Sequence, residues 1–288
     1  MRSKQSDAGG FEGENDASCI RAWYTGGVAV NNGEGLMIQA QLQSSADGAI
    51  VFDATVADKF DPRWFDADYW RAQSRSDDVQ AGRGAVSYVH APFGDCVLRH
   101  YRRGGMVARV MGDRYLWTGA ERTRGFAEFR LLAELSSRGM HVPVPVAARY
   151  RKQGVHYRAD LITRRVANTQ ELAQFVVQGR CDKSLAQKVG EAIAEFHAAG
   201  VYHADLNAHN ILLDGESVWL VDFDRGELRR PARLWQLANL SRLKRSMLKL
   251  GAADGDDDAA FENTIWSALM HDYERRFAQL IAQQDSRP

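Results

Sequence analysis

The sequence lacks the features that are typical of disulfide-rich secreted proteins, proteins with a structural metal site and membrane-spanning proteins. Its cysteines are three in number, far apart and not in the spacing of a metal site: Cys19, Cys96 and Cys181. This argues against a disulfide scaffold or a structural zinc site and predicts a reduced, cytoplasmic protein. No uncharged apolar run reaches the length of about 18 residues that a membrane-spanning helix needs. Residues 1–18 lack an apolar centre and are rich in Gly, Asp, Glu and Ser, so we expect a disordered arm and no secretory signal.

The chain also lacks an excess of charge of either sign. Its 37 basic and 37 acidic side chains give a formal net charge of zero, so no whole-molecule field attracts polyanions. We expect no nucleic-acid partner. Attraction to a smaller anion would come from local clusters, and one basic cluster gathers late in the chain: Arg225, Arg229, Arg230, Arg233, Arg242, Lys244, Arg245 and Lys249. The alternative is a solvated helix face whose charge is balanced by aspartates at 254 and 256–258.

The pattern of apolar residues changes near residues 163–166, from short strand-like runs to helical spacing. Before that point we expect helices over residues 60–70 and 126–135, with strands within residues 26–43, 82–89, 96–101, 142–150 and 155–163. After it we expect two short strands at residues 211–213 and 218–221, and helices over residues 185–196, 232–250 and 259–283. This order predicts two lobes, an N-lobe over residues 19–164 and a C-lobe over residues 165–288.

The most informative segment is a loop that connects a predicted helix to a predicted strand and has the sequence Tyr-His-Ala-Asp-Leu-Asn-Ala-His-Asn over residues 202–210. It places the carboxylate of Asp205 five residues before the carboxamide of Asn210, and Asp222 follows the second short strand. Phosphoryl transfer needs an aligned hydroxyl, neutralised phosphate oxygens and bound Mg²⁺. Asp205 would accept or orient the acceptor hydroxyl, whereas Asn210 and Asp222 would bind Mg²⁺ through oxygen, the ligand atom that this cation prefers. Taken singly, these residues could also form a turn and a helix cap.

This arrangement resembles the protein-kinase catalytic loop H-R-D-x-x-x-x-N, and residues 222–224 (Asp-Phe-Asp) resemble the D-F-G that follows it. In the first half, Gly82 and Gly84 match the start of the kinase Gly-rich loop, whose third glycine corresponds to Ser87 here. Glycines in such a loop let backbone N–H groups approach nucleotide phosphates. The resemblance implies an ATP- and Mg²⁺-dependent phosphotransferase with an α+β, bilobal protein-kinase-like fold, a β-rich N-lobe and a compact helical C-lobe.

The position of the phosphate-binding lysine in kinases corresponds to Arg99 here, because Cys-Val-Leu-Arg over residues 96–99 aligns with V-A-I-K. Arginine pairs bidentately with phosphate and keeps its charge, but its shape differs from that of lysine. Glu128, on the next predicted helix, is the candidate partner that would hold Arg99, unless it is a solvated helix charge. Arg99 and Ser87 leave open a second class of protein, a nucleotide-binding pseudokinase that performs no chemistry.

Three departures from the kinase pattern argue against a protein substrate. Ala204 replaces the arginine of H-R-D, no A-P-E follows Asp222, and only residues 223–288 remain for the part of the C-lobe that would bind a peptide. Kinases of small molecules with the same fold tolerate all three. We therefore expect a small-molecule acceptor.

A finer resemblance covers residues 82–250. The runs Leu-Arg-His-Tyr-Arg-Arg-Gly-Gly at residues 98–105 and Asn-Leu-Ser-Arg-Leu-Lys-Arg-Ser at residues 239–246 resemble the lipopolysaccharide kinase family. This resemblance implies that ATP phosphorylates the 4-hydroxyl of 3-deoxy-D-manno-octulosonic acid (Kdo) on a lipid A precursor, at the cytoplasmic face of the inner membrane of Gram-negative bacteria. Guanidinium groups of the basic cluster would suit the carboxylates and phosphates of that acceptor. A kinase of another sugar, such as a heptose or an aminoglycoside, is the alternative.

Overall fold

The computed structural model describes residues 38–73, 86–102, 113–252 and 258–286. The arm expected at residues 1–18, the first part of the strand expected within residues 26–43, and both Gly82 and Gly84 lie outside the described residues. Among the residues that are described, no helix combines the length and the apolar character that crossing a bilayer requires.

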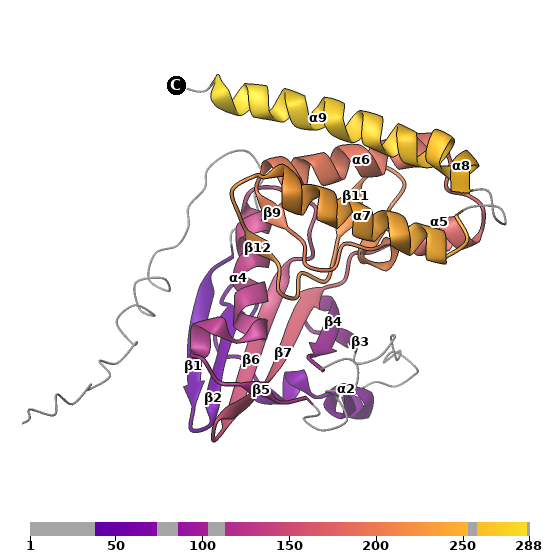
Figure 1. Cartoon of the computed structure of the whole chain (residues 1–288). Helices are drawn as coiled ribbons and strands as arrows, with labels where there is room; N and C mark the ends of the chain where they lie inside the picture. The colour runs from indigo at the N-terminus through magenta and orange to yellow at the C-terminus, as the bar shows by residue number, and fades with distance from the viewer. Residues whose placement is uncertain (1–37, 74–85, 103–112, 253–257, 287–288) are drawn as a thin grey trace, which may run out of the picture.

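A twisted antiparallel sheet dominates the first part of the chain (Figure 1). Its strands lie in the order β1-β2-β6-β7-β4-β3, and β5 pairs with β7. Their bounds are β1 (Ala40–Ser45), β2 (Gly48–Asp53), β3 (Val86–Ala91), β4 (Gly94–His100), β5 (Tyr115–Leu116), β6 (Pro145–Gln153) and β7 (His156–Arg164). Strand β2 was not expected, because five of its six residues are buried and it lacks the alternation that marks a half-exposed strand.

Each face of this sheet is covered by a different helical segment. Helix α4 (Arg124–Ser137), preceded by the short turn η2 (Ala120–Arg122), packs its phenylalanines and leucines on one face. On the other face lie the 3₁₀ turn η1 (Pro62–Phe65) and helix α2 (Ala67–Gln73), with the aromatic rings of Phe60, Phe65 and Trp70 in a second core. The single helix expected over residues 60–70 is wrong, since the segment is divided at Asp66, whose carboxylate accepts a hydrogen bond from the N–H of Asp68.

Helices make up most of the second part of the chain. They are α5 (Leu172–Val177), α6 (Lys183–Ala198), α7 (Arg233–Lys249), α8 (Asp258–Phe261), the π-helical turn η4 (Glu262–Trp266) and α9 (Ser267–Asp285). Short strands lie between them: β8 (Gln170–Glu171), β9 (Val201–Tyr202), β10 (Ile211–Leu213), β11 (Val218–Leu220) and β12 (Glu227–Leu228), with the 3₁₀ turn η3 (Ala208–Asn210) before β10.

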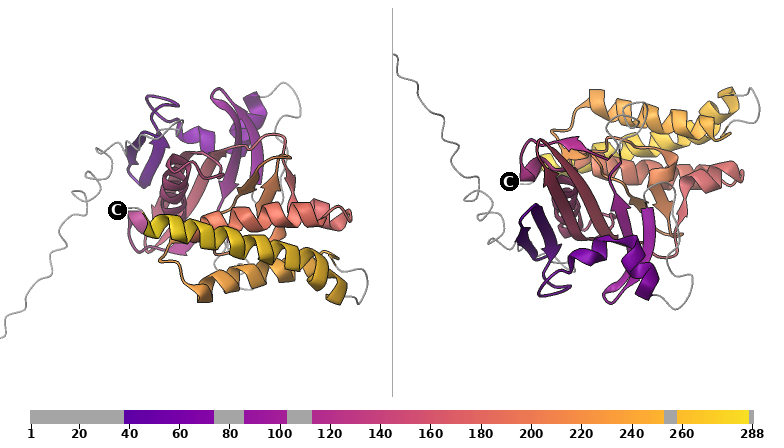
Figure 2. Two further views of the ribbon diagram at one scale, coloured as in Figure 1. Left: turned by 90° about the horizontal axis from the view of Figure 1, so that it is seen from above. Right: turned by 90° about the horizontal axis from the view of Figure 1, so that it is seen from below.

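Helices α6 and α9 run side by side (Figure 2). They approach closely at Gly190, where a Cβ atom would lie only 2.2 Å from the carbonyl oxygen of Leu269. Any side chain at this position would therefore force the two helices apart. The β-rich first part and the helical second part confirm the expected α+β, kinase-like fold class, while the lobe boundary at residues 164/165 stays a prediction.

Candidate active site

The loop at residues 203–210 is held in place by a buried histidine. His203 Nε2 donates to the carbonyl oxygen of Val221 over 2.9 Å, and its Nδ1 accepts from the N–H of Asp205 over 3.2 Å. A carbonyl oxygen can only accept and an N–H can only donate, so these two bonds fix the neutral Nε2–H tautomer. Burial lowers the pKa of His203, which agrees with a neutral ring. His203 thus links the loop that carries Asp205 to the residue immediately before Asp222.

Asp205 and Asn210 lie within this loop and contact each other through the backbone. Asn210 Nδ2 donates to the carbonyl oxygen of Asp205 over 2.9 Å, so the amide oxygen of Asn210 is left for another partner. The side chain of Asp205 is 56% exposed and accepts from Asn207 Nδ2 over 3.1 Å. Its carboxylate is therefore open to an incoming hydroxyl.

Helix α7 supports the loop with three polar residues on one face. The side chain of Asn239 accepts from the N–H of His203 over 3.3 Å and donates to its carbonyl oxygen over 2.9 Å. Ser246 Oγ accepts from the N–H of Ala208 over 3.1 Å, and Arg242 Nη1 lies 3.5 Å from the carboxylate of Asp205. Positions 239, 242 and 246 share one side of a helix. In the sequence this run is recognisable only as family-like, and its role in supporting the loop was not predicted, although its helical spacing is visible.

A second cluster joins the sheet, α4 and the segment after β11. Arg99, on β4, places Nη1 and Nη2 each 3.1 Å from an oxygen of Glu128 on α4, and its Nη1 also lies 2.6 Å from Asp222 Oδ1. Glu128 accepts two further hydrogen bonds, from the Tyr101 hydroxyl over 2.6 Å and from the N–H of Phe223 over 3.1 Å. The carboxylate of Glu128 therefore connects three separate parts of the chain.

Burial controls the electrostatics of this cluster. Glu128 is only 3% exposed, and burial raises its pKa to about 7. The guanidinium of Arg99 has the opposite, smaller effect, because it favours the ionised carboxylate. Burial opposes the charge of Arg99, but Glu128, Tyr101 and Asp222 together raise its pKa above the ordinary value. Arg99 thus stays a cation, as phosphate binding requires.

The segment that follows Val221 has an unusual backbone. Asp222 has a φ of 63°, in the left-handed region that side chains other than glycine seldom adopt. Two residues later, Asp224 Oδ2 accepts from Arg124 Nη1 over 2.9 Å, whereas its Oδ1 is buried and has no hydrogen-bond partner among the described residues. Burial raises the pKa of Asp224.

The donor atoms around Asp222 fit a hard divalent cation. The candidate ligand atoms are oxygens: the amide oxygen of Asn210, the carboxylate of Asp222, which also pairs with Arg99, and the buried Oδ1 of Asp224. Within the described parts of the chain, no three His, Cys, Asp or Glu side chains form a cluster that could hold a metal by itself. Mg²⁺ does not need one, because it takes most of its ligands from phosphates and water.

The structure thus places the site residues in two adjoining groups. One group contains Arg99, Glu128 and Asp222, the other contains Asp205 and Asn210, and His203 connects the two.

The late basic cluster is less uniform than the sequence suggests, since several of its members pair with glutamates: Arg229 with Glu227, Arg233 with Glu274 and Lys244 with Glu262.

Comparisons with known proteins show what this chain resembles. A model described as the lipopolysaccharide kinase (Kdo/WaaP) family matches residues 67–273. Curated proteins named 3-deoxy-D-manno-octulosonic acid kinase match from Xanthomonas euvesicatoria (52% identity) and Stenotrophomonas maltophilia (46%), each over 70% of this chain and 81% of the relative. A third, from Xanthomonas oryzae, is 51% identical over 73% of this chain and 84% of its own. A solved structure titled "WaaP in complex with acyl carrier protein" is 18% identical, with a TM-score of 0.43, over 77% of this chain and 92% of that one.

Proposed function

Because this chain belongs to the lipopolysaccharide kinase (Kdo/WaaP) family, we propose that it transfers the γ-phosphate of ATP to the 4-hydroxyl of Kdo on a lipid A precursor. The observation that carries the proposal is the identity of about half of the aligned residues with curated Kdo kinases. The family match also spans every described residue of the two site groups, from Arg99 to Asp222. Kdo is therefore preferred over a heptose or an aminoglycoside as the acceptor.

The arrangement of side chains supports a role for each. Asp205, with its exposed carboxylate, would accept or orient the proton of the acceptor hydroxyl. Arg99, fixed by Glu128, would bind the phosphates of the nucleotide. Asn210 and Asp222 would hold Mg²⁺, which neutralises phosphate charge when bound. Since Asp222 already pairs with Arg99, the cation and the guanidinium would share this carboxylate.

Arg242 is placed to contribute to acceptor binding. Its guanidinium lies 3.5 Å from Asp205, the residue that would meet the acceptor hydroxyl, and it is 46% exposed. Kdo carries a carboxylate, and guanidinium groups bind carboxylates with two parallel hydrogen bonds. Arg242 would therefore bind the acid group of the sugar beside the hydroxyl that reacts.

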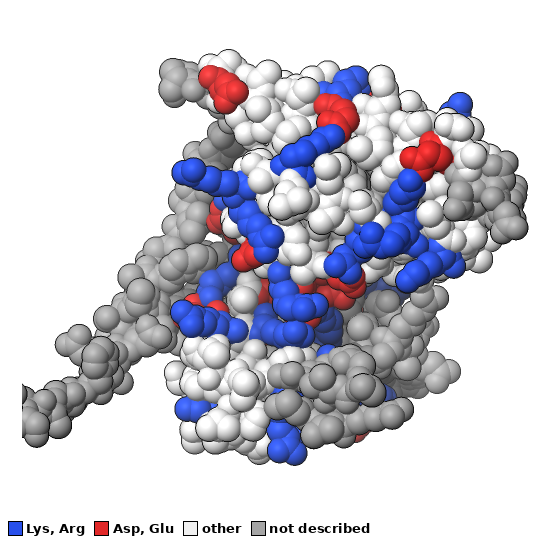
Figure 3. Space-filling view, in the orientation of Figure 1, with Lys and Arg blue, Asp and Glu red and all other residues white. Residues whose placement is uncertain are grey.

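We further propose that the protein meets its lipid-linked acceptor at the inner membrane surface from the cytoplasmic side. Leu228, Leu234 and Leu237 are 42%, 86% and 39% exposed at and near the start of α7, and Arg230 is exposed beside them. Lysine and arginine side chains gather across the face of the molecule that carries α7 (Figure 3). Apolar side chains beside cations are typical of peripheral membrane contacts, each cation contributing about 1 kcal/mol near an anionic surface.

A phosphotransfer assay tests the catalytic proposal. Purified protein is mixed with ATP, Mg²⁺ and a lipid A precursor that carries one Kdo, and the product is analysed by mass spectrometry and NMR. We expect the mass of one phosphate to be added at the 4-hydroxyl, and Asp205→Ala to abolish the addition. Folded protein that leaves this acceptor unchanged but phosphorylates a heptose or an aminoglycoside would overturn the choice of acceptor.

Membrane contact is tested separately by sedimentation with vesicles of phosphatidylglycerol and phosphatidylcholine. We expect the wild-type protein to sediment with the anionic vesicles and the variant Leu234→Ser/Leu237→Ser to remain in solution. The matched control is Val177→Ser, since Val177 is 66% exposed on α5. Equal sedimentation of both variants would contradict a contact through α7.

A further inference from the structure

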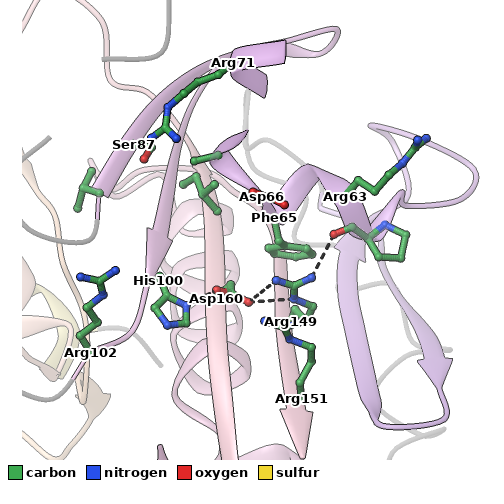
Figure 4. Close-up of a pocket in the computed structure, with 14 residues that line it drawn as sticks. Arg63, Phe65, Asp66, Arg71, Ser87, His100, Arg102, Arg149, Arg151 and Asp160 are labelled. Atoms are coloured by element: carbon green, nitrogen blue, oxygen red, sulfur yellow. Dashed lines mark hydrogen bonds and ion pairs between the residues drawn. The ribbon is translucent and has the colours of Figure 1, made fainter. Parts of the chain in front are cut away.

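A cavity of about 650 Å³ lies on the face of the sheet opposite to α4 (Figure 4). Successive residues of a strand point to opposite faces of the sheet, so Arg99 reaches Glu128 on α4 while His100 points to the other side and lines this cavity. The cavity is therefore separate from the two site groups described above, and its function is a separate question from the proposed phosphotransfer.

The floor of the cavity is a row of polar residues on three neighbouring strands. His100 on β4 pairs with Asp160 on β7 over 2.6 Å, and Asp160 pairs with Arg149 on β6 over 2.7 Å. Arg149 also donates to the carbonyl oxygen of Pro62, and its guanidinium stacks over the ring of Phe65 at 4.5 Å. These partners fix the floor, so its charged groups are already ordered before any ligand arrives.

Cations outnumber acids around this floor. Five arginines line the cavity, against two aspartates, Asp66 and Asp160. Arg63 and Arg71 pair with the neighbouring aspartates 61 and 68, and Arg149 pairs with Asp160. Within the described parts of the chain, the guanidinium groups of Arg102 and Arg151 have neither an ion pair nor a hydrogen bond, although both residues line the cavity. Two guanidinium groups are thus left for a ligand.

The spacing of these cations adds to the case. Arg149 and Arg151 lie two residues apart on β6 and so face the same side of the sheet. Burial lowers the pKa of Arg149, and the charge of Arg151 acts in the same direction, which means that the two guanidinium groups repel each other. An anion beside Arg151 would offset this repulsion and pair bidentately with that guanidinium, whereas the guanidinium of Arg149 is already bonded to Asp160 and to the carbonyl oxygen of Pro62.

We propose that this cavity binds a phosphate group, with Arg102 and Arg151 as its direct ligands and the row formed by His100, Asp160 and Arg149 as a fixed support. A phosphate offers several charged acceptor oxygens to the guanidinium donors, whereas an ammonium group offers none and a neutral acceptor forms weaker hydrogen bonds. The phosphate could belong to a soluble compound or to the headgroup of an anionic lipid. Both sources present the same chemistry to the two arginines.

The first experiment measures binding of inorganic phosphate by calorimetry. The nucleotide cleft is saturated with a non-hydrolysable ATP analogue and Mg²⁺, so that heat from the cleft is excluded. We expect Arg102→Gln and Arg151→Gln each to weaken phosphate binding by roughly tenfold, the usual effect of losing a hydrogen bond between charged groups. The matched control is Lys152→Gln, which removes the same charge from the adjacent position of β6 on the opposite face of the sheet.

A second experiment distinguishes the two sources of phosphate. Vesicles of phosphatidylcholine with phosphatidic acid, whose headgroup is a phosphate monoester, are sedimented with the same variants. A loss of vesicle binding in Arg102→Gln and Arg151→Gln, but not in Lys152→Gln, identifies a lipid headgroup. Phosphate binding that depends on both arginines without an effect on vesicles identifies a soluble phosphate. The proposal is overturned if neither phosphate nor vesicle binding distinguishes the two arginine variants from the control.

Discussion

The guanidinium of Arg99 lies 2.6 Å from the carboxylate of Asp222, while the same group makes two parallel hydrogen bonds to Glu128. One side chain therefore joins the helix that flanks the sheet to the residue proposed to bind Mg²⁺. The lysine found at this position in protein kinases carries a compact charge, without the planar fork that bonds Glu128 twice. The arginine is thus a specific feature of this site rather than a conservative replacement.

From this arrangement we predict that Arg99→Lys lowers kcat/KM by roughly tenfold or more, because one of the two charge-assisted hydrogen bonds to Glu128 is lost. Steady-state kinetics with ATP and the Kdo acceptor would measure the change. The control is Arg122→Lys, an exposed substitution of the same kind just before α4. Full activity of Arg99→Lys would show that a point charge is sufficient here.

Glu128→Gln is predicted to destabilise the fold by about 3–5 kcal/mol, the usual cost of removing one partner of a buried ion pair. Glu128 is almost fully buried, so the change leaves Arg99 without its main partner and also weakens the hydrogen bonds from Tyr101 and Phe223. Urea denaturation would give the free energy of unfolding. Glu134→Gln, at an exposed pair with Arg138 on the same helix, should cost less than about 1 kcal/mol. Similar losses in the two variants would contradict the assigned role of Glu128.

Most of the residues of this site could be predicted from short sequence motifs. The loop at residues 203–210 and Asp222 were recognised because their spacing along the chain follows from the chemistry that they perform. Arg99 and Glu128 are 29 residues apart in the sequence. Their pairing could still be predicted, because the kinase motifs follow one another in a fixed order and the partner of the phosphate-binding residue lies on the next helix. The role of Asn239 could not, since its bonds to His203 depend on how α7 packs against a loop 36 residues earlier.

Ion pairs between residues far apart in the sequence could not be predicted either. The late basic cluster looked uniform in sequence, but Arg233 and Lys244 pair with glutamates on α9 and η4 that only the fold brings near. Conversely, the cavity row of His100, Asp160 and Arg149 depends on the order of β4, β7 and β6, which local patterns do not specify.

We predict that the free energy of unfolding decreases between neutral and mildly alkaline pH, because His100 loses its proton in this range. Its hydrogen bond to Asp160 raises the pKa of His100 above the unfolded value of about 6.5. The folded state therefore holds this proton more tightly, so the stabilisation is complete below about pH 6.5 and is lost as pH rises through the folded pKa. The free energy of unfolding, measured from pH 6 to pH 9, should decline more steeply in the wild type than in His100→Asn. His271→Asn, at an exposed position, is the control and should keep the wild-type slope.

The support of the catalytic loop by α7 gives the last prediction. Ser246→Ala removes the acceptor for the N–H of Ala208, whereas Ser246→Thr retains a hydroxyl at the same place. Asn239→Ala leaves both backbone groups of His203 without partners in a buried position, which costs about 1–3 kcal/mol. Because the loop carries Asp205 and Asn210 but not Arg99, both alanine variants should lower kcat by a larger factor than they raise KM for ATP.

The controls for this prediction lie on the same helix. Ser241→Ala changes an exposed serine of α7 and should keep full activity, and Ser246→Thr should recover most of the kcat that Ser246→Ala loses. If the substitutions only damaged the packing of α7, Ser246→Ala and Ser246→Thr would lower the melting temperature and the amount of active enzyme to the same extent. Recovery by threonine would instead indicate that the hydroxyl positions the loop, and with it the carboxylate of Asp205, for transfer.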